Sequence, residues 1–191
     1  PIQLDLSGSV SADSFADLTK IVENNQIAFG NQYTWSSYNP TTHKVVYTQK
    51  ADKLTIMDGS SQIIFTINAN DQVVSYEQTY AGSVQALGKE RELITAQKAV
   101  EILYLAGRIS SKATVQSVKL SYYQSLVLKD FSIYSPAWYI EIRQADGQLI
   151  ARRVDAIHGT VLANETLETT NTQTQRTTTS NTTTTQSVQQ Q

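Results

Sequence analysis

Two side chains near the end of the sequence have types and a spacing that could support acid–base chemistry. Asp155 and His158 lie three residues apart in the turn DAIHG. A carboxylate that orients an imidazole activates a nucleophile only when a positioned serine, threonine or lysine completes the arrangement. The spacing does not supply that third group, and an aspartate that caps a turn before Gly159 gives the same pattern. We therefore predict a structural turn and no enzyme activity.

The remaining polar residues favour neither a metal site nor a cofactor site. The chain has no cysteine and only two histidines, His43 and His158, so zinc would need carboxylates to complete its shell. Isolated glycines at turns do not form a phosphate-binding loop. Four residues have the oxygen atoms that calcium prefers, but they lack the spacing and the terminal glutamate of a calcium loop, so we interpret them as turn formers: Asp58, Asn68, Asn70 and Asp71.

Composition limits the possible functions further. The 191 residues suffice for one large domain or two small ones, and a net charge of −2 with scattered lysines and arginines gives no footprint for nucleic acid. No apolar run approaches the roughly 20 residues that cross a bilayer. Because the chain begins at Pro1 and not at methionine, we expect a fragment or a processed product from which a signal or anchor segment was removed.

The pattern of apolar residues predicts an α+β fold in the order helix, strands, helix, strands. Ser11 can cap a first helix in SADSFADLTKIVENN, and Thr95 can cap a second in AQKAVEILYLAG, which Gly107 ends. Strand-like runs rich in β-branched and aromatic residues follow each helix. They are QYTWSSY, KVVYTQ, QIIFTIN and QVVSYEQTY after the first helix, and TVQSVKLSYYQSLVL, PAWYIEIRQ, QLIARRV and GTVL after the second.

This order predicts two similar modules and a tail. Residues 1–82 would form a helix with an antiparallel β-meander, and residues 83–163 a helix with a β-hairpin. A gapless echo between INANDQVV (67–74) and VDAIHGTV (154–161) fits duplication, and it fits equally well the general similarity of unrelated hairpins. Residues 164–191, rich in Thr, Gln and Asn, have too few apolar side chains to offset the entropy of ordering and are predicted to be disordered.

Period-two alternation sorts the strand residues of the second module into two faces. Trp138, Ile140 and Ile142 are predicted to be buried, while Tyr139, Glu141 and Arg143 would point outward. Pro136 cannot donate to a ladder, which favours an edge position, a bulge or a strand start. Five residues of the preceding strand are expected to meet the second helix: Val118, Leu120, Tyr122, Leu126 and Leu128.

Tyrosines of the predicted strands are the candidate partner-binding residues: two lie on the polar face of the second module, and two share a face with Val74 in the first. Tyrosine combines contact area with a polar tip and is enriched at interfaces. The alternative is that exposed tyrosines only satisfy β-propensity and cross-strand pairing. The candidates are Tyr76, Tyr80, Tyr123 and Tyr139.

The segments ITAQKAVEILY, VQSVKLSYY, YSPAWYIEI and RVDAIHGTV resemble the C-terminal half of the YycI family. Likewise, SYNPTTHKVVYTQ, GSSQIIFTIN and VVSYEQTY resemble its N-terminal half, so the resemblance spans roughly residues 30 to 162 in order. YycI proteins are membrane-anchored accessory proteins of the WalK/WalR (YycG/YycF) two-component system in Gram-positive bacteria. The resemblance implies an extracytoplasmic domain, without its single anchor helix, that binds a YycH-like protein and the sensor histidine kinase and adjusts cell-wall signalling. The Thr-rich tail is not a hallmark of the family.

Two alternatives remain open. A helix followed by a hairpin that ends in VDAIHGTV also resembles PepSY-type modules, which are associated with protease inhibition and propeptides. A hydrolase or carbohydrate-processing enzyme would depend on Asp155, His158 and scattered acidic residues. The sequence predicts no cofactor under the leading interpretation, and it leaves any small-molecule ligand unknown.

Overall fold

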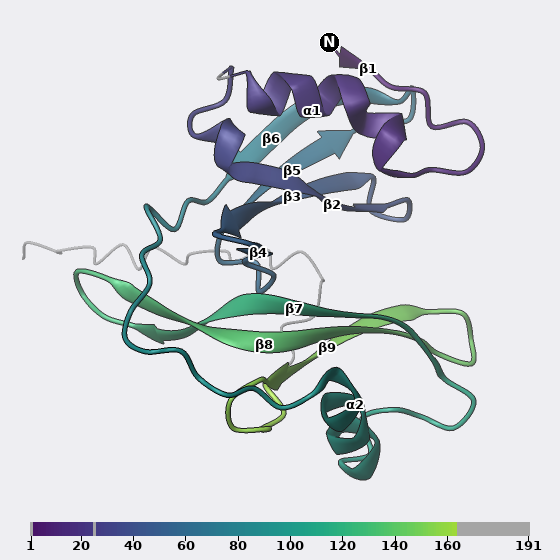
Figure 1. The fold of residues 1–191 in the computed structure, drawn as a ribbon. Coiled ribbons are helices and arrows are strands. Elements are labelled where there is room, and N and C mark those ends of the chain that lie inside the picture. The colour runs from purple at the N-terminus through teal and green to yellow at the C-terminus, as the bar shows by residue number, and fades with distance from the viewer. Residues whose placement is uncertain (1, 25, 164–191) are drawn as a thin grey trace, which may run out of the picture.

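The computed structural model describes residues 2–24 and 26–163, so the predicted disordered tail at 164–191 lies outside the described residues. Figure 1 shows two β-sheets between two helices, with α1 on the outer side of the first sheet and α2 on the outer side of the second. An α+β fold with antiparallel sheets is therefore confirmed. A loop without helix or strand, residues 79–95, connects the two halves.

The N-terminal half forms one antiparallel sheet in the order β1-β6-β5-β3-β2, and β4 pairs only with β3. Helix α1 is preceded by a 3-10 turn, and a second 3-10 turn leads into β2. The elements are β1 (Ile2–Gln3), η1 (Ala12–Phe15), α1 (Ala16–Glu23), η2 (Gly30–Gln32), β2 (Tyr33–Asn39), β3 (Lys44–Ala51), β4 (Leu54–Thr55), β5 (Gln62–Ile67) and β6 (Gln72–Gln78).

The first core lies between α1 and one face of this sheet. Phe15, Leu18 and Val22 follow helical spacing and are fully buried against strand residues that include Tyr47. Gly30 allows the chain to pass directly over the helix, because a Cβ there would lie 1.9 Å from the carbonyl oxygen of Val22. Full burial of such large side chains fixes α1 on the sheet.

The C-terminal half consists of α2 (Ala96–Leu105), β7 (Thr114–Val127), β8 (Ser132–Arg143) and β9 (Leu149–Asp155), with the strands in the order β7-β8-β9. The predicted helix signals are confirmed: the Thr95 hydroxyl accepts a hydrogen bond from the Lys98 N–H at 3.1 Å, and Gly107 takes a positive φ of 66° after the last turn. The apolar face of α2 packs on Ile140 and Ile142, which are fully buried as predicted.

Two predictions about these strands are wrong. Leu126 and Leu128 do not meet α2, since 46% and 43% of their surfaces are exposed. A bulge between Gln124 and Leu126 shifts the register, and β9 pairs with β8 only at residues 137–143, so the outer parts of β7 and β8 extend past the third strand. Pro136 lies in the central strand and not in an edge strand. It falls just beyond the β9 register, where its carbonyl accepts a hydrogen bond from Ala156 at 2.9 Å.

The polar face of the second sheet is not an outward face, which corrects the largest error of the sequence analysis. Tyr139 is only 4% exposed, and Ser121 and Arg153 on the same face are also buried. Figure 1 shows the reason: α2 covers one face, while β4 and its flanking loops approach the sheet from the opposite side. Long-range contact with the first half therefore buries residues that alternation alone assigns to solvent.

Residues 56–58 attach the two halves to each other, and we call them the edge clamp. Ile56 forms a parallel bridge with Tyr122, and the Met57 N–H donates to the Tyr122 carbonyl at 3.0 Å. The Asp58 carboxylate accepts a hydrogen bond from the backbone N–H of Gln124 and two from Ser60, at 2.9 Å from its N–H and 2.6 Å from its hydroxyl. The clamp thus occupies the free edge of β7.

The two echoed turns are built alike, with one difference in length. Asn68 and Asp155 each use a side-chain oxygen to accept backbone hydrogen bonds within their own turns. The Asn68 N–H donates to the carbonyl of residue 72, whereas the Asp155 N–H donates to that of residue 160, so the second turn is one residue longer. The two sheets also differ in strand number, and duplication of a PepSY-like or YycH-like module stays a prediction.

We expect Asp58→Ala to lower the free energy of unfolding by about 2–3 kcal/mol, because it leaves the Gln124 N–H without its charged acceptor at the junction of the two halves. Chemical denaturation followed by circular dichroism measures this loss. Asp130→Ala, at an exposed position of the β7–β8 turn, is the matched control and should change stability little. An equal effect of both changes would contradict the role of the clamp.

Candidate partner-binding surface

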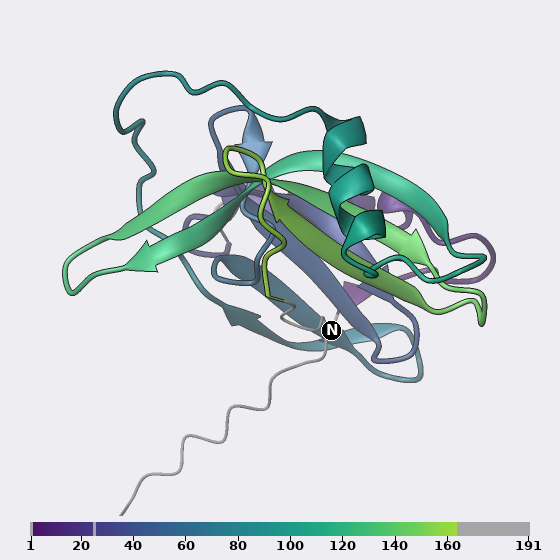
Figure 2. The same cartoon turned by 90° about the horizontal axis from the view of Figure 1, so that it is seen from below.

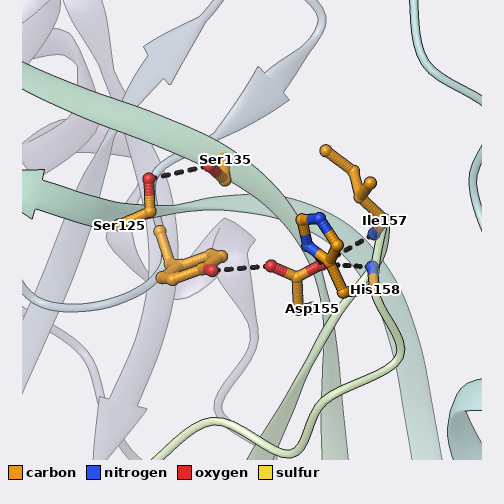
Figure 3. Close-up of polar contacts among 6 residues, drawn as sticks. Ser125, Ser135, Asp155, Ile157 and His158 are labelled. Carbon is orange, nitrogen blue, oxygen red and sulfur yellow. Dashed lines mark hydrogen bonds and ion pairs between the residues drawn. The ribbon is translucent and has the colours of Figure 1, made fainter.

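Asp155 lies at the centre of a turn in which its carboxylate is fully used (Figure 3). It is 4% exposed. One oxygen accepts a hydrogen bond from the Tyr123 hydroxyl at 2.7 Å, and the other accepts the backbone N–H groups of Ile157 at 2.8 Å and His158 at 2.6 Å. The predicted turn cap is confirmed.

The imidazole of His158 has no hydroxyl partner that could act as a nucleophile among residues 2–24 and 26–163. Its side chain is 71% exposed, and Nδ1 lies 3.2 Å from the Asp155 carboxylate. The nearby hydroxyls of Ser125 and Ser135 bond to each other at 2.7 Å and not to the imidazole (Figure 3). The Asp155 carboxylate therefore holds its own turn in place and orients the Tyr123 hydroxyl.

Burial and hydrogen bonding set the charges of this turn. Burial alone raises the pKa of Asp155, but the hydrogen bonds from His158, Tyr123 and Ile157 together bring that pKa below its ordinary value. Burial first, and then the neighbouring Asp155 carboxylate, raise the pKa of Tyr123 to about 12. At neutral pH the tyrosine is thus a neutral donor to an ionised carboxylate.

The four candidate tyrosines have different environments. Tyr76 is 49% exposed and packs beside Phe65. Tyr80 stacks on Phe29 with ring centroids 4.3 Å apart, and its hydroxyl donates to Gln32 at 3.0 Å. Tyr123 donates a hydrogen bond to Asp155. The predicted exposure of Tyr139 is wrong, because the residue is 4% exposed, and this burial raises the pKa of its phenol to about 12. The structure does not bring the four together on one surface.

The described residues also give no metal-binding cluster and no spanning helix. Within the part of the chain that the structure describes, no three histidine or acidic side chains gather as metal ligands. Asn68 bonds within its own turn and Asp58 bonds to Ser60 and Gln124, so both are occupied as acceptors. None of the helices in the described ranges is long and apolar enough to cross a membrane.

The most distinctive surface feature is a two-stranded projection that we call the β7–β8 arm, residues 124–135. Figures 1 and 2 show it extending from the body of the protein, away from the end of β9. Register continues along it, with Leu126 opposite Ile133 and Val127 opposite Ser132, and the N–H of Leu128 donates to the carbonyl of Phe131 at 2.9 Å. The arm therefore has an ordered backbone, and the described residues place no third strand beside it.

The end of the arm is apolar. Four large side chains there are between 43% and 65% exposed, and together we call them the apolar tip: Leu126, Val127, Leu128 and Phe131. Lys129 and Asp130 in the turn are exposed and opposite in charge, so the tip has no net charge. Contiguous exposed apolar side chains on a projecting element are typical of interaction sites.

The apolar tip was not predicted, because alternation placed Leu126 and Leu128 on the face that meets the second helix. Two signals were available. Three consecutive apolar residues, Leu126-Val127-Leu128, interrupt the alternation that a strand with one covered face keeps. The third strand, β9 (LIARRVD), is only half as long as β7, so it cannot cover the whole β7–β8 hairpin.

Comparison with known protein families now identifies the chain. The YycI protein family matches residues 1–157, which is most of the sequence. The chain belongs to the YycI family. Membership associates it, as an accessory protein, with the WalK/WalR two-component system, and confirms the resemblance seen in the sequence. No curated protein matches the chain.

The pKa of Asp155 is lowered in the folded protein, so its ionised form stabilises the fold at every pH above 3.8, the ordinary pKa of an aspartate. This contribution is lost as the pH falls through the folded pKa. We expect Asp155→Asn to cost about 2–3 kcal/mol at neutral pH and progressively less in acid. Denaturation of both proteins across the acidic range measures the difference. Asp146→Asn, in an exposed turn where the carboxylate accepts the Gln148 N–H at 2.9 Å, is the control.

Tyr123 gives an independent check on the same turn. A folded pKa raised from 10.0 to about 12 contributes stability that is present below pH 10.0 and lost as the pH rises toward 12. Ultraviolet titration of tyrosinate should show late-ionising groups, one of which disappears in Tyr123→Phe. A Tyr123 that ionises together with the exposed tyrosines would contradict the buried hydrogen bond.

Proposed function

We propose that this chain is the extracytoplasmic domain of a membrane-anchored regulatory protein that binds a YycH-like protein and the WalK sensor histidine kinase. Family membership supports the connection with this signalling system. The observation that carries the binding role is the apolar tip of the β7–β8 arm, which the rest of the described chain leaves uncovered. The protein acts by contact and not by catalysis in this proposal.

The arm suits recognition because its own fold does not use the tip. A two-stranded ribbon is marginal in water without a third strand or a packed face. Exposing Val127 at 65% and Phe131 at 58% forgoes the stabilisation that burial would bring, roughly 1.5–3 kcal/mol for each large apolar side chain. A partner that covers the tip recovers this free energy.

Regulation requires more than tight binding. The kinase shifts between signalling states only if the accessory domain binds one state more tightly than the other. A rigid body that carries a projecting arm can make this distinction, because the position of the tip relative to the body is fixed by the long β7–β8 ladder. Anchoring to the membrane would restrict the approach of the arm to its partner.

Of the predicted tyrosines, Tyr76 is the one that can join such an interface without rearrangement, as it is 49% exposed. Tyr80 can contribute only through the part of its surface that Phe29 leaves free. A binding role for Tyr139 would require a rearrangement of the fold, because it is only 4% exposed. Partner binding through the tyrosines therefore ranks second to binding through the arm.

The double change Leu126→Ser with Phe131→Ser tests the proposal. In the full-length protein, produced with its YycH-like partner and WalK, we expect the dissociation constant of the complex to rise at least roughly tenfold, since two apolar contacts are lost. Copurification and calorimetric titration measure binding, and kinase autophosphorylation measures the regulatory effect.

The matched control is Leu105→Ser, which changes a 73% exposed leucine on α2, away from the arm. It should leave both binding and kinase output unchanged. Circular dichroism should show that both variants keep the wild-type fold, because all three changed residues are exposed. Wild-type binding by the arm variant would contradict docking through the apolar tip.

A further inference from the structure

A crevice of about 400 Å³ lies between the two halves of the protein, at the base of the arm and away from the apolar tip. Its walls are the 58–60 turn, residues 123–124 of β7, Arg153 of β9 and residues 162–163. This volume falls in the range of small-molecule sites, and a junction between two modules is a common place for one.

Arg153 is the unusual group in this crevice. It is 9% exposed, and its Nε is inaccessible to solvent without a hydrogen-bond acceptor among the described residues. Within residues 2–24 and 26–163 the guanidinium also forms no ion pair. Burying a charged donor without an acceptor is unfavourable, which is why buried arginines are normally paired.

The other polar groups of the crevice already have partners. The Asp58 carboxylate accepts hydrogen bonds from Ser60 and Gln124, and the Tyr123 hydroxyl donates to Asp155. The amide nitrogen of the Gln124 side chain donates to the Ser132 hydroxyl at 2.9 Å. Arg153 is thus the wall residue with unused donors, and it calls for an acceptor that carries negative charge.

We infer that the crevice binds a carboxylate, held by Arg153. The planar fork of a guanidinium matches the two oxygens of a carboxylate. Two carboxylates already lie close by, Asp58 in the wall and Asp155 bonded to the wall residue Tyr123, so a singly charged ligand suits the site better than a phosphate dianion. Leu162 and Ala163 give the crevice an apolar side, which fits a carboxylate with an aliphatic substituent.

Acetate and butyrate are the probes, titrated into the protein in place of chloride at constant ionic strength. Saturable shifts of the backbone amide signals of Gly59 and Tyr123 in nuclear magnetic resonance spectra report occupancy, and the thermal midpoint should rise with concentration. Arg153→Met should weaken binding at least roughly tenfold, since it removes a charge-assisted hydrogen-bond pair. Arg153→Lys, which keeps the charge but loses the fork, should weaken it by a smaller factor.

Arg143→Met is the control, because Arg143 is exposed and its guanidinium already donates to the Gly147 carbonyl at 3.3 Å. It should bind both probes like the wild type. Absence of a saturable response in the wild-type protein, or an equal response in Arg153→Met, would overturn the site. Tighter binding of inorganic phosphate than of either carboxylate would overturn the assigned ligand class. These outcomes are independent of whether the apolar tip binds a protein partner.

Discussion

The edge clamp is the contact on which the rest of this structure depends. Residues 56–58 join β7 through a single parallel bridge at Ile56, a backbone hydrogen bond to Tyr122 and a carboxylate that accepts the Gln124 N–H. This pairing covers a free sheet edge and turns the polar face of the second sheet toward the first half. The β7–β8 arm begins at Gln124, where the clamp ends, so one contact separates the buried part of the hairpin from the exposed part.

This division gives the two parts of the hairpin different roles. The inner part holds Tyr123 against Asp155 and buries Tyr139, which makes it part of the scaffold. The outer part carries the apolar tip, for which the described chain offers no cover. Because the crevice at Arg153 shares the 58–60 turn with the clamp, a bound carboxylate would touch the element that joins the two halves. Ligand and partner sites would then be connected through a single short segment.

Local features of the fold were readable from the sequence. The Thr95 cap, the Gly107 stop and the burial of Ile140 and Ile142 each depend on residues that are near in sequence or on strict alternation. The turn cap at Asp155 is also a local feature, because its carboxylate accepts hydrogen bonds from the N–H groups of residues two and three positions later.

Long-range features were not readable. Tyr139 was assigned to solvent because nothing local shows that β4 and its neighbours, some 80 residues earlier, approach that face. The bulge between Gln124 and Leu126 moved the leucines out of register, and no turn residue marks it. Arg153 was missed for a related reason, since the alternation of the third strand does not show that Arg153, and not Arg152, lines a crevice between the two halves.

Hydrogen–deuterium exchange of the full-length protein, free and bound to its YycH-like partner, tests the central claim most directly. We predict slower exchange on binding in the peptide that covers residues 126–131, with little change in the inner hairpin around Ser121 and Tyr139, which is already protected in the free protein. Unchanged exchange in the arm, combined with new protection at the inner hairpin or around Tyr76, would contradict it.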